Sequence, residues 1–211
     1  MPSTARYLVL MVLVGLSFSI YGQATLGPNV ISEAVEITLP KGWRAASRKQ
    51  IAQFELARDR LLAENELRPR LEPKEVTTFQ AEKEIGGVSG FVGITVMPAE
   101  ASQAQVSSYS VEKTENLAAW LIEQHRKALF AARCTEVSFS APALQDIGGK
   151  KAIGFAMEFT TPDEVKRAGT KQYVYMRNAT VILNSAAPVE SPQLLRDEIA
   201  NALASVKLTE N

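Results

Sequence analysis

Residues 151–161 alternate strictly between large apolar side chains and small or polar ones. The large apolar set is Ile153, Phe155, Met157 and Phe159. Gly154, Ala156 and Glu158 stand between them. Because successive side chains of a β-strand point to opposite faces of the sheet, this spacing predicts a strand that buries one face in a hydrophobic core. The fold must therefore supply neighbouring strands and a cover for that face.

Similar patterns predict the neighbouring strands. They lie at residues 35–39, 76–81, 88–97, 135–141 and 172–185, and Arg177-Asn178 folds the last of these into two. Gly86-Gly87 and Gly148-Gly149 supply tight turns of the kind that join antiparallel strands. Short turns between successive strands favour an antiparallel sheet over a doubly wound parallel one.

Three segments with apolar residues at helical spacing are predicted to cover the sheet. They span residues 48–67, a stretch from 111 or 114 to 132, and residues 192–206, whereas the Ser-rich and Gln-rich residues 102–110 are expected to form a loop. Ser47 and Gln50 have the spacing of a capping box, and Ser191 before Pro192 predicts an N-cap followed by proline at the first helical position. Trp43 is expected to fold back onto the core. The predicted class is α+β, an antiparallel β-sheet packed with helices.

The N-terminus resembles a cleavable signal peptide over residues 1–24. Arg6 precedes an apolar run at residues 7–20, and Gly22-Gln23-Ala24 puts small residues where signal peptidase cleaves. The run of about 14 residues is short of the roughly 20 that span a bilayer as a helix. We expect cleavage after Ala24, a periplasmic or secreted location, and a single domain over residues 25–211 with no stable membrane span. An uncleaved N-terminal anchor is the alternative.

The charge balance argues against a nucleic-acid partner. Lys and Arg total 23, and so do Asp and Glu, whereas nucleic-acid binders normally carry a clearly basic patch. Cys134 is the only cysteine, so it can form no internal disulfide, and we expect a buried thiol. An intermolecular bridge or a reactive thiol are the alternatives.

His125 is the only histidine and hence the only candidate base for a catalytic triad. It lies between Leu121 and Leu129 on the apolar stripe of the second predicted helix, which predicts a packing residue against the sheet. A catalytic pair with Cys134 is disfavoured by the helix end between the two residues. Because no paired carboxylates stand at ligand spacing beside His125, no metal and no cofactor are expected.

Two short motifs are better explained by turns than by sites. The glycine-rich stretch at residues 86–93 lacks the lysine of a P-loop, and Phe91 stands where a nucleophile elbow around Ser89 would need glycine. Asn178-Ala179-Thr180 matches the N-glycosylation sequon, and a turn asparagine is the alternative role for Asn178.

The second face of the predicted sheet is the candidate binding surface. It is expected to gather small groups, namely Ser89, Gly93, Thr95, Ser138, Ser140, Gly154 and Ala156. Such a flat surface accepts either a helix of the same chain or a partner. The candidate binding residues are Ser89, Phe91, Ser138, Ser140 and Glu158, and no catalytic residue is predicted.

Four segments resemble, in chain order, the PsbP-like family. They are residues 37–43 (ITLPKGW), 147–159 (IGGKKAIGFAMEF), 173–187 and 204–208 (ASVKL). That family shares its fold, an α/β/α sandwich, with a Ran-binding nuclear-import factor and with bacterial chaperones of secretion effectors. Because such proteins are mostly extrinsic subunits, binding modules and chaperones, the resemblance implies a non-enzymatic role.

The expected function is that of an exported, non-enzymatic protein that binds another protein, as an accessory subunit, an effector chaperone or an immunity protein. The alternative is an enzyme or small-ligand carrier that uses a pocket near His125. Polar residues clustered in a deep pocket would favour the alternative, and a shallow apolar patch would favour the binding protein. The sequence indicates neither the partner's identity nor the oligomeric state.

Export gives the first testable prediction. Protein isolated from its native host should have an intact mass that corresponds to a chain starting at Thr25, because the small residues before it fit signal peptidase. A soluble chain that starts at Met1 or Pro2 would contradict the prediction.

Overall fold

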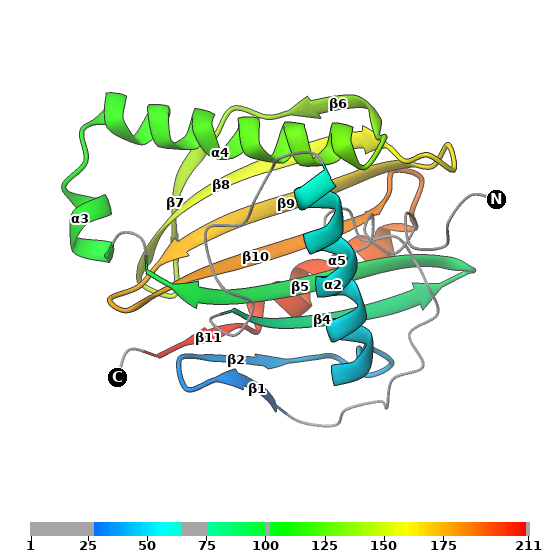
Figure 1. The fold of residues 1–211 in the computed structure, drawn as a ribbon. Helices are drawn as coiled ribbons and strands as arrows, with labels where there is room; N and C mark the ends of the chain where they lie inside the picture. The colour runs from blue at the N-terminus through cyan, green and yellow to red at the C-terminus, as the bar shows by residue number, and fades with distance from the viewer. Residues whose placement is uncertain (1–27, 65–75, 100–101, 210–211) are drawn as a thin grey trace.

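A computed structural model describes residues 28–64, 76–99 and 102–209. Its centre is an eight-stranded antiparallel sheet with the order β3-β4-β5-β10-β9-β8-β6, and β7 pairs with β8 beside β6 (Figure 1). A second sheet has the order β1-β2-β11. The predicted α+β class is confirmed. The predicted signal peptide lies outside the described residues.

The strands of the large sheet are β3 (Arg44–Ala45), β4 (Thr77–Ile85), β5 (Val88–Pro98), β6 (Thr135–Phe139), β7 (Ala143–Ile147), β8 (Lys150–Thr160), β9 (Lys166–Tyr175) and β10 (Ala179–Pro188). The small sheet holds β1 (Pro28–Ser32), β2 (Val35–Thr38) and β11 (Lys207–Leu208). The helices are α2 (Arg48–Glu64), α3 (Gln103–Ser107), α4 (Val111–Ala131) and α5 (Gln193–Ala204).

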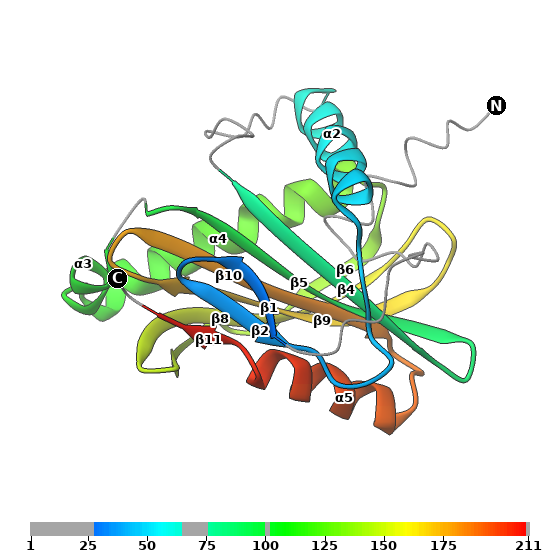
Figure 2. The same cartoon turned by 90° about the horizontal axis from the view of Figure 1, so that it is seen from below.

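Helices cover both faces of the large sheet. Viewed from below, α2 and α4 lie on one side and α5 lies on the other (Figure 2). On the α4 side, Leu121 packs with Ile153 and Phe155. On the α5 side, Leu195 and Ile199 pack with strands of both sheets. The result is an α/β/α sandwich, as the resemblance implied.

Turn and cap chemistry explains several boundaries. Gly86-Gly87 joins β4 to β5, and Gly148-Gly149 joins β7 to β8. All four glycines have φ between 58° and 78°, which side chains rarely allow and tight hairpins require. The predicted capping box is confirmed, because the backbone N–H of Gln50 donates to Ser47 Oγ and that of Ser47 donates to Gln50 Oε1.

Some local predictions are wrong. Residues 102–110 contain α3, which begins with a capping box between Ser102 and Gln105. Pro192 rather than Ser191 is the N-cap of α5, and the buried Ser191 Oγ has no hydrogen-bond partner within the described part of the chain. Strand β9 begins at Lys166, earlier than the alternation indicated, and the short strands β1, β3, β7 and β11 were not predicted.

Contacts with the turn that follows β2 help to hold α5 in its position on the sheet. Trp43 is 1% exposed, as expected of a side chain folded back onto the core. Its indole Nε1 donates to Glu198 Oε2 on α5 at 3.2 Å, and Lys83 Nζ lies 3.1 Å from the same oxygen. Hydrogen bonds to an ionised group are stronger than neutral ones, so Glu198 ties α5 firmly to Trp43 and to Lys83 of β4.

The two tryptophans offer a matched test of this packing. Trp43→Phe should lower the free energy of unfolding by about 1–3 kcal/mol, because it removes buried volume and the hydrogen bond to Glu198. Trp120→Phe should cost less than half as much, because Trp120 is 44% exposed. Urea denaturation of both variants measures the difference, and equal costs would contradict the assigned role of Trp43.

Candidate functional site

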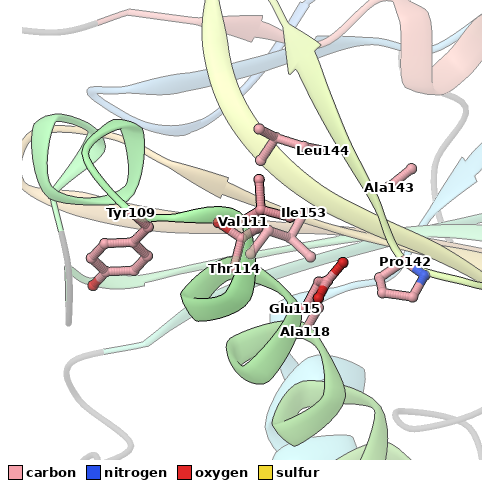
Figure 3. Close-up of a pocket in the computed structure, with 9 residues that line it drawn as sticks. All are labelled: Tyr109, Val111, Thr114, Glu115, Ala118, Pro142, Ala143, Leu144 and Ile153. Atoms are coloured by element: carbon pink, nitrogen blue, oxygen red, sulfur yellow. The ribbon is translucent and has the colours of Figure 1, made fainter.

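An apolar pocket of about 250 Å³ lies between the start of α4 and the edge formed by β7 and β8 (Figure 3). Val111, Thr114, Glu115 and Ala118 contribute from α4, and Tyr109 stands just before the helix. Pro142, Ala143, Leu144 and Ile153 contribute from the strand side. We call it the α4–β7 pocket.

Two large apolar side chains of this pocket are open to solvent. Val111 is 76% exposed and Leu144 is 56% exposed. Ser110 is the N-cap of α4, with its side chain accepting from Lys113 N–H, so Val111 is the first helical residue and no preceding turn covers it. Leu144 opposes Ile153 in the β7–β8 pair and therefore shares the α4 face. Together they make a shallow apolar patch.

Glu115 is the only charged side chain among the residues that line the α4–β7 pocket. No ion pair is recorded for it within the described part of the chain. Lys113, two residues before it, lies 3.8 Å from the centre of the Tyr109 ring and thus packs on the pocket's aromatic side chain. The arrangement offers one carboxylate beside an apolar surface.

A second pocket, of about 450 Å³, lies between α5 and β9 on the opposite face. Its apolar wall includes Leu183, Ile199 and Leu203. Its polar side holds Thr170 and Ser185, whose hydroxyl groups are 2.9 Å apart in a hydrogen bond. Arg196 also lines this pocket, and its guanidinium donates to the backbone carbonyl of Ser191 at 2.6 Å. A ligand with one polar and one apolar side would fit such a lining.

His125 packs against the sheet, as its place on the apolar stripe predicted. Its ring centre lies 5.6 Å from that of Phe155, its Nε2 contacts Tyr173 Oη, and its Nδ1 lies 3.4 Å from Lys171 Nζ. Because an ammonium group can only donate, Nδ1 accepts and the ring proton resides on Nε2, which donates to Tyr173 Oη. Both ring nitrogens are therefore engaged by the chain's own side chains.

Burial and the charge of Lys171 lower the pKa of His125 well below its ordinary value of 6.5. Burial likewise raises the pKa of Tyr173 above its usual range. The imidazole and the phenol are thus both neutral at pH 7. The cluster of His125, Lys171 and Tyr173 stabilises the packing of α4 on β9, and it does not line the α4–β7 pocket or the α5–β9 pocket.

Cys134 is 3% exposed, as expected of a buried thiol. It packs with Phe54, Leu129 and Phe159, away from the aromatic cluster that contacts His125. Burial, assisted by the negative charge of Asp163, raises the pKa of the thiol to about 12, so the thiolate is scarce at neutral pH. The structure does not bring Cys134 and His125 together as a pair.

The predicted surface of small groups is divided between two faces, so the prediction that its residues share one face is wrong. The register puts Ser89, Gly93 and Thr95 on the face under α4. Ser138 opposes Glu158 on the other face, where Gly154 and Ala156 also lie. The alternation of side chains within each strand was predicted correctly, but the prediction of which residues of different strands share a face was not.

The candidate binding residues have separate local roles. Phe91 is 6% exposed and Ser89 is half-buried on the same face, whereas Glu158 is exposed on the other face and pairs with Lys166 Nζ at 3.3 Å. Ser140 Oγ accepts from the backbone N–H of Ala156. Asn178 is exposed in the turn between β9 and β10.

Sequence reasoning missed the α4–β7 pocket because it missed β7. The available signal was Gly148-Gly149, since a two-residue glycine turn implies a strand on each side. In the described ranges, no group of three or more His, Cys, Asp or Glu side chains is arranged to hold a metal ion. Nor does that part of the chain contain a helix that is long and apolar enough to cross a membrane.

Comparison with solved structures shows which known fold this is. The solution structure of cyanobacterial PsbP (CyanoP) from Synechocystis sp. PCC 6803 matches with a TM-score of 0.53 and 12% identity, over 92% of this chain and 98% of that one. The chain has a PsbP-like fold. At this identity the match shows the PsbP-like fold alone, and it confirms the resemblance found in the four sequence segments.

Two further structures match less well. LpqN of Mycobacterium tuberculosis, which is involved in cell envelope biogenesis, has a TM-score of 0.47 and 10% identity over 89% of this chain and 91% of that one. A Bacteroides thetaiotaomicron VPI-5482 protein has a TM-score of 0.48 and 9% identity over 89% of this chain, which spans only 50% of that longer chain. No family model and no curated protein sequence matches.

The His125 cluster predicts how stability depends on pH. Because the fold lowers the pKa of His125, the unfolded chain takes up the proton first, so His125 should reduce stability as pH falls below about 6.5, by at most about 1.4 kcal/mol per pH unit. His125→Gln should lower the free energy of unfolding by about 1–3 kcal/mol at pH 7.5, where the histidine is neutral in the folded and the unfolded protein. It should also make the loss of stability below pH 6.5 less steep.

Urea denaturation of the parent and of His125→Gln between pH 5 and pH 8 checks this prediction. Parallel declines in the two proteins would show that other groups cause the pH dependence. A folded His125→Gln protein that lost a turnover or a small-molecule affinity of the parent would show instead that the histidine is functional.

Proposed function

We propose that this is an exported, non-enzymatic accessory protein that binds another protein through the α4–β7 pocket. The observation that carries the proposal is the pair of exposed apolar side chains, Val111 and Leu144, on either side of that pocket. Covering water-exposed aliphatic groups beside a pocket lowers the free energy, so these side chains favour the binding of a partner. The PsbP-like fold supports the proposal, because the resemblance implies a non-enzymatic binding role.

The chemistry of the pocket also favours a binding role over catalysis. Its single charged lining residue is Glu115, and its hydroxyl groups belong to Tyr109 and Thr114. The Thr114 hydroxyl donates to the backbone carbonyl of Ser110, so it takes part in the start of the helix rather than in a pair with Glu115. His125, with both ring nitrogens engaged, is a packing residue in this proposal.

A small-ligand carrier is the second candidate function, and the α5–β9 pocket is the observation that favours it. Its volume of about 450 Å³ falls in the usual range for small-molecule sites. The affinity of a ligand bound there should not change when Leu144 is substituted, because Leu144 lies at the α4–β7 pocket. The two candidate functions can therefore be separated.

Leu144→Glu tests the leading proposal, and Leu194→Glu is its matched control. Leu194 is 58% exposed and lies on α5, so the two substitutions add the same charge at equally exposed leucines of different surfaces. Leu144→Glu should weaken partner binding at least about tenfold, or about 1.4 kcal/mol, because the new carboxylate must be desolvated against apolar groups. Leu194→Glu should bind like the parent.

The measurement has two stages. Crosslinking in the native host followed by mass spectrometry identifies the partner, and calorimetry with the purified partner then compares the three proteins after circular dichroism shows each to be folded. Equal affinity of both variants for that partner would contradict the proposal.

A further inference from the structure

The α4–β7 pocket lies against a strand edge. Within the described part of the chain, β7 pairs with β8 alone, so the other edge of this strand faces no strand of either sheet. A free edge presents a row of backbone N–H and C=O groups to which an extended segment can add. The pocket and the free edge therefore form one continuous surface.

The register of β7 decides which side chains an added strand would bring to the pocket. Leu144 points to the α4 face, so the residue that opposed it on an added strand would point to that face as well. An apolar side chain at that position would reach the patch formed by Leu144 and Val111. In an antiparallel pair, the residue two positions later on the added strand would point the same way and would oppose Pro142, which lines the pocket together with Glu115.

The charge at the pocket favours a basic residue at that second position. Glu115 is the only charged lining residue, and Glu112 lies in the first turn of the same helix. Lys113, which packs on Tyr109, and the roughly half positive charge of the helix N-terminus offset most of the charge of these two carboxylates but not all of it. Glu115 is the one charged side chain that lines the pocket itself. A lysine or arginine of the added strand would find a carboxylate beside the apolar patch.

Self-pairing of β7 fits the same surface less well. A second copy would bring the sequence ALQDI, which supplies Leu144 but only Asp146 as a charged residue, so nothing basic would reach Glu115.

We propose that an extended segment of the partner protein adds to the free edge of β7, with an apolar side chain in the α4–β7 pocket and a basic side chain two residues away facing Glu115. This inference rests on the proposed function and specifies the mode of recognition. The backbone bonds supply affinity, and the two side chains supply specificity.

Synthetic peptides test the mode directly. The probes are capped heptapeptides, acetyl-Ser-Thr-X-Thr-Lys-Thr-Ser-amide with X being Ile, Val, Leu, Phe or Tyr, titrated into the full mature protein labelled with ¹⁵N. At millimolar peptide, amide shifts should centre on residues 143–147 and on the start of α4, and hydrogen exchange of the outward amides of β7 should slow. Leu144→Glu should abolish these changes, whereas Leu194→Glu should keep them.

Two modifications of the best heptapeptide separate backbone from side-chain recognition. N-methylation of alternate residues blocks one edge of the peptide, so one of the two methylated peptides should bind at least about tenfold more weakly and the other nearly as well as the parent. Replacing the lysine by glutamine should weaken binding about two- to fivefold in the parent, as for an exposed ion pair, and should have little effect in Glu115→Gln.

Three outcomes would overturn the inference. Tolerance of both methylated peptides, with shifts confined to the pocket, would show side-chain docking without strand addition and would leave the proposed function intact. Concentration-dependent dimerisation that Leu144→Glu abolishes would make a second copy the occupant. No shift with any heptapeptide at millimolar concentration would remove the mode of recognition, while the native-partner experiment with Leu144→Glu would still decide the proposed function.

Discussion

Helix α5 can approach the large sheet closely because Gly90 has no side chain. A Cβ atom at Gly90 would lie 2.7 Å from Cδ1 of Ile199, well inside van der Waals contact. Leu195 and Ile199 fill the space above it and join the largest cluster of buried side chains. Because protein interiors are packed as densely as organic crystals, one added methyl group would force Cδ1 of Ile199 to move against its neighbours Ala187 and Leu195. This close packing holds α5 over β4, β5 and β10.

The position of α5 leaves the other half of that face open. Ala156, Glu158 and Thr170, on β8 and β9, are exposed there, and the α5–β9 pocket lies along the boundary. Helix α4 covers β8 and β9 on the opposite face, where its first residues meet the edge strand β7 (Figure 1). The incomplete cover of a large sheet by few helices thus places the exposed surfaces at its β7 and β8 end.

Local patterns predicted the elements well, because each depends on forces within a short segment. The alternation from Ile153 to Phe159, the capping box at Ser47 and the glycine turn at Gly86-Gly87 all appear in the structure. Strand β7 escaped prediction because it buries little, so no alternation marks it. The shared face of Ser89 and Ser138 was wrong because the phase between strands is set by tertiary pairing, which one-strand periodicity does not contain. The α4–β7 pocket depends on that pairing and could not be read from the pattern.

The His125 cluster and the α4–β7 pocket differ in what folding does to their side chains and backbone groups. The polar groups of His125 bond to Tyr173 and Lys171, so the fold itself consumes their hydrogen-bonding capacity. Val111 and Leu144 instead remain exposed after folding is complete, and the free edge of β7 keeps its outer backbone groups. Polar groups that are hydrogen-bonded within the fold stabilise the protein. Exposed apolar side chains and unpaired backbone groups of a strand edge can instead contribute to the binding of a partner. On this physical ground we place the proposed binding function at the edge of the sheet rather than at His125.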